Sequence, residues 1–525
     1  MSSDLRMGAR FLWDLRRYLE RTLTLSEAEA QIRAQIRDRE TAFLQVMRQG
    51  IFDHGPSPYR KLMAYYHISY KDVAEWVRES GVEGALGMLY DAGVYLTLDQ
   101  FKGRAPIERP SFRITTESSD FDSPILTSYF TAETGGSGGS PRRIRVDLGI
   151  LAYEAAYNLI AARRLGQETE PYLIWRPIPP AAAGLKDVLR RSKAGLPIDR
   201  WFSQTDPRFM RDRQAAFTGM VVRTARLWGA KAALPEHAPL ERADIIARWM
   251  AEETAAGRLA HASMSASSGV RVCTAAQELG LDISGSLFRL GGEPHTAAKA
   301  QILAEAGAKS VNHYSMSELG RVGLTCGQPE ALDQVHLVTD KLALIQRPPP
   351  GWQEDEGVSA IYLTTLLPMM PKIMLNVETG DQGVVEERHC GCPWSELGMT
   401  TCIHTIRSYE KLTTEGMHFT GADLMRLVEV VLPQRFGGDP SDYQLVEEEI
   451  DGIARVSLLV SPRVGDVDEA AVIETATQTL ASRNAGAGMM AEIWQQARTL
   501  RVERREPYAT NSAKIQPLHV RRGGD

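Results

Sequence analysis

A run of glycine and hydroxyl residues lies between two apolar segments. It extends from Thr131 to Arg142 and reads TAETGGSGGSPR. Its four glycines permit positive φ, so several amide N–H groups can converge, and Thr134, Ser137 and Ser140 add hydroxyl donors. Such a loop can bind phosphate oxygens, although its composition also fits a flexible linker. The apolar flanks and Pro141 favour a tight loop between two strands. No Gly-Lys-Ser/Thr closes the run, so it is not a Walker loop.

Two further segments combine a predicted strand with polar residues at its end. One reads LFRLGGEPH from Leu287 to His295, and the other reads VNHYSMSE from Val311 to Glu318. Ligand sites of α/β sheets collect at such strand ends. A Mg²⁺ ion bound to a triphosphate takes one or two carboxylates, so Glu318 could be its ligand and Ser317 could bind a phosphate. In isolation, the residue type favours a solvated loop carboxylate at Glu318, because charged loop residues are commonplace.

Three cysteines and a histidine have the chemistry of a structural metal site. Three thiolates and one imidazole complete a tetrahedral zinc site. The alternative is a set of buried free cysteines beside an unrelated core histidine. The candidate ligands are Cys326, His336, Cys390 and Cys392, with Cys402 and His404 as competing ligands.

Length and composition limit the class of protein to which these residues belong. The 525 residues exceed what one hydrophobic core usually serves, so we expect two or more domains. A formal net charge of -6 gives no reason to expect nucleic acid as a partner, and no apolar run is long enough to cross a membrane. Five cysteines, an odd number, without a recognisable secretion signal indicate a reducing cytoplasm. Cys273 is expected in the core.

The order of predicted elements indicates a mixed α/β class. The glycine run is followed by an Ala-rich helix from Leu148 to Arg164, and further helices follow the two strand ends. Asp451-Gly452 between two apolar runs predicts a β-hairpin in a small C-terminal part. We therefore predict a helical extension over 1–58, a large α/β domain over 59–406 and a mobile α+β lid over 407–525.

Four motifs occur in the order seen in the adenylate-forming superfamily, which the chain resembles from about Tyr59 to Lys514. The phenylacetate-CoA ligase branch resembles it most. Each motif is weak alone, but four in order make a strong signal. The motifs are TGGSGGSP from Thr134, GGEP from Gly291, YSMSE from Tyr314 and TGD from Thr379.

The resemblance implies a role for each matched position. Tyr314 stacks on adenine, Asp381 accepts hydrogen bonds from the ribose hydroxyls and Glu318 binds Mg²⁺. Arg407 reaches the ribose and phosphate, and Lys514 is the catalytic cation of the lid. The glycine loop holds the β and γ phosphates of ATP through Thr134, Gly135, Gly136, Ser137, Gly138 and Gly139. The adenine and acyl pocket is lined by Gly292, Glu293 and Pro294.

The chain departs from the family pattern at the hinge and in the glycine loop. Tyr409 and Glu410 replace the aspartates that usually follow Arg407, Arg142 stands where a lysine is frequent, and Gly139 departs from the common loop form. These departures leave open a non-catalytic descendant that binds a nucleotide or an acid.

The resemblance implies an AMP-forming acid–thiol ligase. Such an enzyme joins a carboxylic acid, here an aryl or arylacetic acid, to AMP and then transfers it to coenzyme A or to a phosphopantetheine thiol. Transfer to an amine is the alternative. ATP, Mg²⁺ and the thiol are the implied cofactors, with zinc at the cysteines. An acyl carrier protein and a second copy of the chain are the partners that the sequence leaves open.

Overall fold

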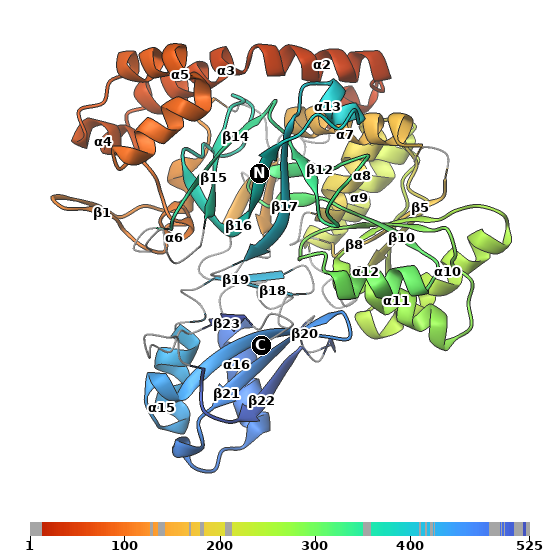
Figure 1. Cartoon of the computed structure of the whole chain (residues 1–525). Coiled ribbons are helices and arrows are strands. Elements are labelled where there is room, and N and C mark those ends of the chain that lie inside the picture. Colours follow the sequence, from red (N-terminus) through yellow and green to blue (C-terminus); the bar gives the residue numbers. More distant parts are fainter. Residues whose placement is uncertain are drawn as a thin grey trace.

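Helices flank both a parallel and an antiparallel sheet, which confirms the predicted mixed α/β class. Figure 1 shows a larger N-terminal part with a smaller C-terminal part below it. Among the described helices, none combines the length and hydropathy needed to cross a bilayer. The domain boundaries remain predictions. The computed structural model describes residues 13–125, 130–134, 142–146, 148–166, 170–178, 183–204, 213–349, 359–408, 411–414, 417–420, 424, 426–481, 494, 496–497, 499–508 and 518–520.

The N-terminal helices run along one side of the larger part (Figure 1). Thr24 and Ser69 begin two of them, and each hydroxyl accepts a hydrogen bond from a backbone N–H of the first turn. Ile32 and Phe43 are buried in the main core, so these helices pack apolar side chains against it. The helices are α2 (Leu25–Arg37), α3 (Arg39–Gln45), α4 (Pro58–Tyr65), α5 (Tyr70–Asp91) and α6 (Leu98–Phe101). The strands β1 (Ile107–Arg109) and β2 (Phe112–Ile114) follow them.

A six-stranded parallel sheet has the order β10-β9-β8-β5-β6-β7. Helices alternate with its strands because each crossover must return the chain to the start of the next parallel strand. The strands are β5 (Tyr172–Trp175), β6 (Arg200–Ser203), β7 (Pro235–His237), β8 (His261–Met264), β9 (Leu287–Leu290) and β10 (Lys309–Asn312). The helices are α7 (Leu148–Arg164), α8 (Ala183–Lys193), α9 (Arg213–Leu227), α10 (Ala243–Ala255), α11 (Ala266–Glu278) and α12 (Ala297–Glu305).

A seven-stranded antiparallel sheet has the order β11-β12-β13-β17-β16-β15-β14. The chain passes from the parallel sheet to this one at His313, between β10 and β11. The segment YSMSE therefore lies where the two sheets meet. The strands are β11 (Tyr314–Met316), β12 (Gly320–Thr325), β13 (Val335–Leu337), β14 (Leu342–Arg347), β15 (Ala360–Thr365), β16 (Val377–Glu387) and β17 (Thr401–Ser408), with the short helix α13 (Pro393–Glu396) before β17.

The C-terminal part contains the predicted hairpin. Asp451 and Gly452 both have positive φ, of 51° and 67°, as a two-residue hairpin turn requires. The turn lies close to α12, since a Cβ added at Gly452 would approach Ile302 Cδ1 to 2.6 Å. The strands are β18 (Lys411–Thr414), β19 (Met417–Thr420), β20 (Tyr443–Ile450), β21 (Ile453–Val460), β22 (Leu500–Arg504) and β23 (Leu518–Val520), with helices α15 (Leu432–Phe436) and α16 (Glu469–Ala481).

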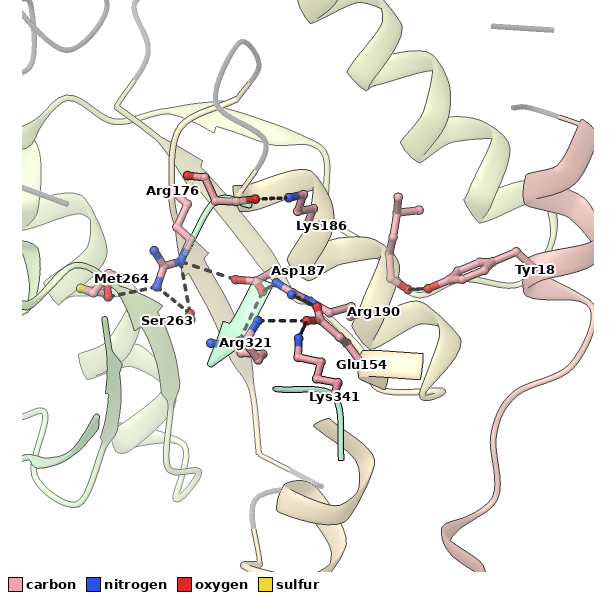
Figure 2. A network of polar contacts seen from close by, with 12 residues as sticks. Tyr18, Glu154, Arg176, Lys186, Asp187, Arg190, Ser263, Met264, Arg321 and Lys341 are labelled. Carbon is pink, nitrogen blue, oxygen red and sulfur yellow. Dashed lines mark hydrogen bonds and ion pairs between the residues drawn. The ribbon is translucent and has the colours of Figure 1, made fainter. Parts of the chain in front are cut away.

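A buried ion-pair network joins the helices of the parallel sheet to the antiparallel sheet (Figure 2). Glu154 of α7 accepts a hydrogen bond from Arg190 of α8 at 2.6 Å and forms an ion pair with Lys341, which precedes β14. Arg190 also donates to Asp187 at 2.5 Å. Burial by itself raises the pKa of Glu154, but the charges of Lys341 and Arg190 outweigh it, so the pKa lies below its ordinary value. Burial likewise raises the pKa of Asp187, but the charges of Arg190, Arg321 and Arg176 outweigh it and lower that pKa to about 2.

We predict that Glu154→Gln destabilises the protein by about 3 kcal/mol, because it leaves buried cations without their carboxylate. Urea unfolding at pH 7 measures the change. The control Glu108→Gln breaks an exposed pair with Arg113 and should cost less than about 1 kcal/mol. Because the pKa values of Glu154 and Asp187 are lower in the folded chain than in the unfolded chain, their stabilisation is present above about pH 4 and is lost as the pH falls toward 2. Equal losses of unfolding free energy in Glu154→Gln and Glu108→Gln would contradict the stabilising role of the Glu154 ion pairs.

Candidate functional site

The glycine run connects two paired strands. β3 (Phe130–Thr134) and β4 (Arg142–Val146) are antiparallel, and Thr134 pairs with Arg142 across the base of the loop. This confirms the predicted strand, loop, strand order. The loop residues themselves lie outside the described residues, namely Gly135, Gly136, Ser137, Gly138, Gly139, Ser140 and Pro141.

The segment GGEP follows β9 and makes a turn held by buried polar contacts. Gly292 has φ 89°, which a side chain would disfavour. Glu293 is buried and accepts hydrogen bonds from the Ser267 backbone N–H at 2.9 Å and hydroxyl at 2.6 Å, and Lys299 Nζ lies 3.3 Å from the same carboxylate. Lys299 also donates to the Pro294 carbonyl at 3.1 Å. The Glu293 carboxylate therefore positions this turn.

Three of the residues matched to nucleotide binding lie on strands of the same antiparallel sheet. The Tyr314 hydroxyl donates to Asp381 Oδ2 at 2.7 Å, which links β11 to β16. Asp381 pairs with Ser408 and the next residue of β16 pairs with Arg407, so both matched residues lie at one end of the β16–β17 ladder. Arg407 donates to the buried Asp333 at 3.0 Å. Burial and the neighbouring Asp381 carboxylate raise the pKa of Tyr314 well above its ordinary value, so it remains a hydrogen-bond donor.

Glu318 is buried in the turn between β11 and β12 and lies near two lysines. Lys102 Nζ is 3.8 Å from Glu318 Oε1. Lys186 of α8 donates to the carbonyl of the exposed Ser317 at 3.4 Å. Burial, followed by the charge of Arg190, lowers the pKa of Lys186 to about 8. A Mg²⁺ ion takes one or two carboxylates together with substrate phosphates, and Glu318 has the ligand type for this role. The catalytic candidate Lys514 lies outside the described residues, as do the hinge residues Tyr409 and Glu410.

The four predicted zinc ligands form one cluster. Their ligand atoms all lie within 4.8 Å of one another. His336 Nε2 lies 3.2 Å from Cys326 Sγ, 3.4 Å from Cys390 Sγ and 3.2 Å from Cys392 Sγ. Tetrahedral zinc with bonds of about 2.0 Å to nitrogen and about 2.3 Å to sulfur places these atoms roughly 3.5 Å apart. The spacing therefore fits a zinc ion at the centre of the cluster.

Contacts around the cluster also suit a metal site. His336 Nδ1 lies 2.7 Å from the Met399 carbonyl, which directs the proton to Nδ1 and leaves Nε2 as the ligand. The Cys326 thiol and His336 hydrogen-bond to Cys392 and lower its pKa, which favours a thiolate. Cys402 lies 3.5 Å from Nδ1, the nitrogen not available to a metal. His404 contacts Thr405 instead, so neither competing ligand belongs to the cluster.

None of the candidate site residues from the sequence lies between Pro171 and Leu240, yet the structure places much of the buried charge there. Arg176, which follows β5, and Asp187 and Arg190 of α8 belong to the network of Figure 2. The spacing of Asp187 and Arg190, three residues apart on a helix, was a usable signal. The contact of Arg321 with Asp187 spans 134 residues and that of Lys341 with Glu154 spans 187, so neither had such a signal.

Comparisons with known proteins identify the fold. No family model matches the chain, and no curated protein matches its sequence. The chain is similar to the crystal structure of a 2-hydroxyisobutyryl-CoA ligase in complex with 2-HIB-AMP and CoA in the thioesterification state. The identity is 14%, the TM-score is 0.54, and the match covers 95% of this chain and 91% of that chain.

A second solved structure is an o-succinylbenzoate CoA synthetase double mutant from Bacillus subtilis. It has 13% identity and a TM-score of 0.41, with coverage of 74% of this chain and 68% of that chain. At sequence identities this low, a structural similarity supports a conclusion about the fold alone. Of these two, only the 2-hydroxyisobutyryl-CoA ligase, with its TM-score of 0.54, is similar enough for that conclusion. This protein therefore has the fold of the adenylate-forming acyl-CoA ligases, with a large N-terminal α/β part and a small C-terminal part.

Proposed function

We propose that this protein activates a carboxylic acid with ATP and transfers it to a thiol. In the first step a carboxylate oxygen attacks the α-phosphorus of ATP, the bond to the β-phosphate oxygen breaks, and pyrophosphate leaves. In the second step a thiol sulfur attacks the acyl carbon, AMP leaves, and the thiol proton is released. Neither step needs a side-chain nucleophile, so positioning and charge stabilisation are the protein's contribution.

One observation carries the proposal. Four segments that are far apart in the sequence match one family in order, and the Tyr314–Asp381 hydrogen bond links two of them directly. Arg407 lies beside Asp381 in the β16–β17 ladder. The similarity in fold to a ligase with a bound acyl-adenylate and CoA supports this interpretation.

The residues have distinct proposed roles. Asp381 accepts hydrogen bonds from the ribose hydroxyls, Tyr314 contacts the adenine, and Arg407 reaches the ribose and phosphate. Glu318 holds Mg²⁺, which when bound neutralises charge on the phosphates. Lys514 on the C-terminal part stabilises charge at the joining carboxylate and α-phosphate, and the C-terminal part then rotates to admit the thiol.

Within the adenylate-forming superfamily, we propose the phenylacetate-CoA ligase branch for this protein. It is supported by the motif forms in this sequence, and it favours an aryl or arylacetic acid and coenzyme A or a carrier-bound phosphopantetheine as acceptor. We also propose structural zinc at Cys326, His336, Cys390 and Cys392, on the fit of their spacing. This ion would join the loop after β12 to the segment before α13.

We predict that Glu318→Gln and Lys514→Ala each lower the rate of acid-dependent pyrophosphate release about 100-fold, because each removes charge stabilisation from the first step. A coupled pyrophosphate assay with a panel of aryl and aliphatic acids measures this. Glu305→Gln, an exposed change on α12, is the control and should leave the rate unaltered. The proposed function fails if no acid elicits ATP-dependent release, or if both variants keep the full rate.

We predict that Asp381→Asn weakens ATP binding about 10- to 100-fold, since a charged hydrogen-bond acceptor is lost. Calorimetry measures the Kd without any need for turnover. Glu387→Gln on the same strand removes an exposed carboxylate and should bind ATP normally. An unchanged Kd for Asp381→Asn would contradict the proposal that Asp381 accepts hydrogen bonds from the ribose hydroxyls.

We predict one zinc ion per chain in native mass spectrometry. Cys390→Ser should lose the ion and lower the melting temperature, because a ligand of the cluster is removed. Cys273→Ser, which alters a buried cysteine outside the cluster, should keep the ion. A metal-free mass after gentle purification would contradict the zinc assignment.

A further inference from the structure

The strand β17 contains an extra residue directly before Arg407. Between two pairs of the β16–β17 ladder, β17 contributes Thr405 and Ile406 while β16 contributes only Gly383. Two residues opposite one form a β-bulge. Because side chains alternate along a strand, an extra residue reverses the alternation beyond it. The face of the sheet on which the Arg407 side chain lies therefore depends on this bulge.

The backbone of the bulge is strained at Thr405. Its φ is 54°, in the left-handed region. Among the described non-glycine residues with positive φ, it is the only one with a β-branched side chain. Such a side chain makes this conformation costly, and it persists only where surrounding contacts fix it. The bulge therefore needs a partner that holds its backbone.

The buried carboxylate of Asp333 is that partner. Its Oδ1 accepts a hydrogen bond from the Thr405 backbone N–H at 2.8 Å, and its Oδ2 accepts one from the Ile406 N–H at 2.9 Å. The same Oδ2 accepts a third from Arg407 Nη1 at 3.0 Å. All three partners are donors, and an ionised carboxylate accepts at both oxygens. An amide at this position would turn its NH₂ group toward at least one of these donors.

The loop that carries Asp333 is itself anchored to both large sheets. Asn312 at the end of β10 donates its side-chain N–H to the Asp333 carbonyl at 3.3 Å. Two residues later the chain enters β13, where Val335 pairs with Ile403 of β17. Asp333 therefore holds the bulge from a fixed position between the parallel sheet and β17.

Asp333 contacts only one side of the Arg407 guanidinium. Nη1 donates to Asp333 and to the Ile406 carbonyl at 2.6 Å. No acceptor among the described residues contacts its Nη2 or Nε, and the side chain is 35% exposed. A planar guanidinium that is held at one nitrogen presents its other edge in a fixed direction, which suits the oxygens of a phosphate or a sugar. Asp381 lies beside it, since the next residue of β16 pairs with Arg407.

We propose that Asp333 is a positioning residue for nucleotide binding, which holds the bulge of β17 so that the outer edge of Arg407 meets the nucleotide beside Asp381. This inference rests on the proposed function and adds to it the residue that orients Arg407. Asp333 does not touch the nucleotide. It raises the affinity because the guanidinium is ordered before the ligand arrives, so binding does not have to order it.

Calorimetry with MgATP on the full chain tests this role. Asp333→Asn keeps the shape of the side chain but removes its charge and one acceptor, and the Kd for ATP should rise about 10-fold. The control Glu330→Gln removes an exposed carboxylate from the same loop, where it pairs with Arg388, and should keep the Kd. An unchanged Kd in Asp333→Asn would overturn the inference.

A double-mutant cycle separates positioning from a general effect on the fold. In an Arg407→Met background, Asp333→Asn should leave the Kd for ATP unchanged, because the side chain through which Asp333 acts is already gone. A purely structural role predicts the same fold-change in Kd in both backgrounds. That result would also overturn the inference.

Thr405→Gly tests the bulge without changing any charge. Glycine adopts positive φ at little cost, so this variant should bind ATP normally and melt at a temperature at least as high as the unaltered protein. Weaker ATP binding in Thr405→Gly would contradict the proposal, because it would assign the orientation of Arg407 to the threonine side chain rather than to the backbone that Asp333 holds.

Arg407→Lys provides the test if circular dichroism shows that Asp333→Asn does not fold. Lysine keeps the positive charge but lacks the planar fork, so it cannot contact Asp333 and the nucleotide through separate edges. The Kd for ATP should rise about as far in Arg407→Lys as in Arg407→Met. Normal ATP affinity in Arg407→Lys would overturn the inference.

The outcomes separate this inference from the proposed function. If Asp333→Asn weakens ATP binding only where Arg407 is present, but no acid elicits pyrophosphate release, the positioning role stands and the proposed function fails. If acids elicit release and Asp333→Asn binds ATP normally, the proposed function stands and the inference is wrong.

Discussion

The arrangement of the two large sheets depends on a buried carboxylate. Glu154 lies on α7, receives Arg190 from α8 and forms an ion pair with Lys341 at the start of the antiparallel sheet. Each of these groups would be costly to bury alone, because removing one partner leaves an uncompensated charge in a medium of low dielectric constant. Together they fix the angle at which α7 and α8 meet β12 and β14, and therefore the place where β10 passes into β11.

The proposed site lies at this junction. Its residues come from elements that are not neighbours in sequence: a turn after β9, the β11–β12 hairpin and the ends of β16 and β17. Ligand sites at the carboxyl ends of parallel strands are common because loops there can vary without disturbing the sheet. Here the antiparallel sheet contributes Tyr314, Asp381 and Arg407, and Asp333 holds Arg407 and the backbone of β17 in position. A rigid frame therefore surrounds residues that are proposed to contact a nucleotide.

The same junction explains why the chain needs two kinds of polar cluster. The Cys326, His336, Cys390 and Cys392 cluster connects β13 to the loop after β12 and to the segment before α13. The arginine-rich network lies inside, between the sheets, where Glu154 and Asp187 pair with the buried cations. The first cluster has the ligand types of a metal site, and the second is held by ion pairs between side chains.

By itself the sequence determined the mixed α/β class, the hairpin at Asp451-Gly452 and the helices that follow the strand ends, because periodicity and turn chemistry are local. It also indicated Cys326, His336, Cys390 and Cys392 as candidate metal ligands, and the structure brings these four together. Only the tertiary structure decided that Tyr314 bonds to Asp381, that Cys402 faces the wrong nitrogen of His336, and that Arg176, Arg190, Arg321 and Lys341 share two carboxylates. These contacts join residues tens to hundreds of positions apart. Their existence depends on how the sheets pack, a property of the whole fold that no local pattern encodes.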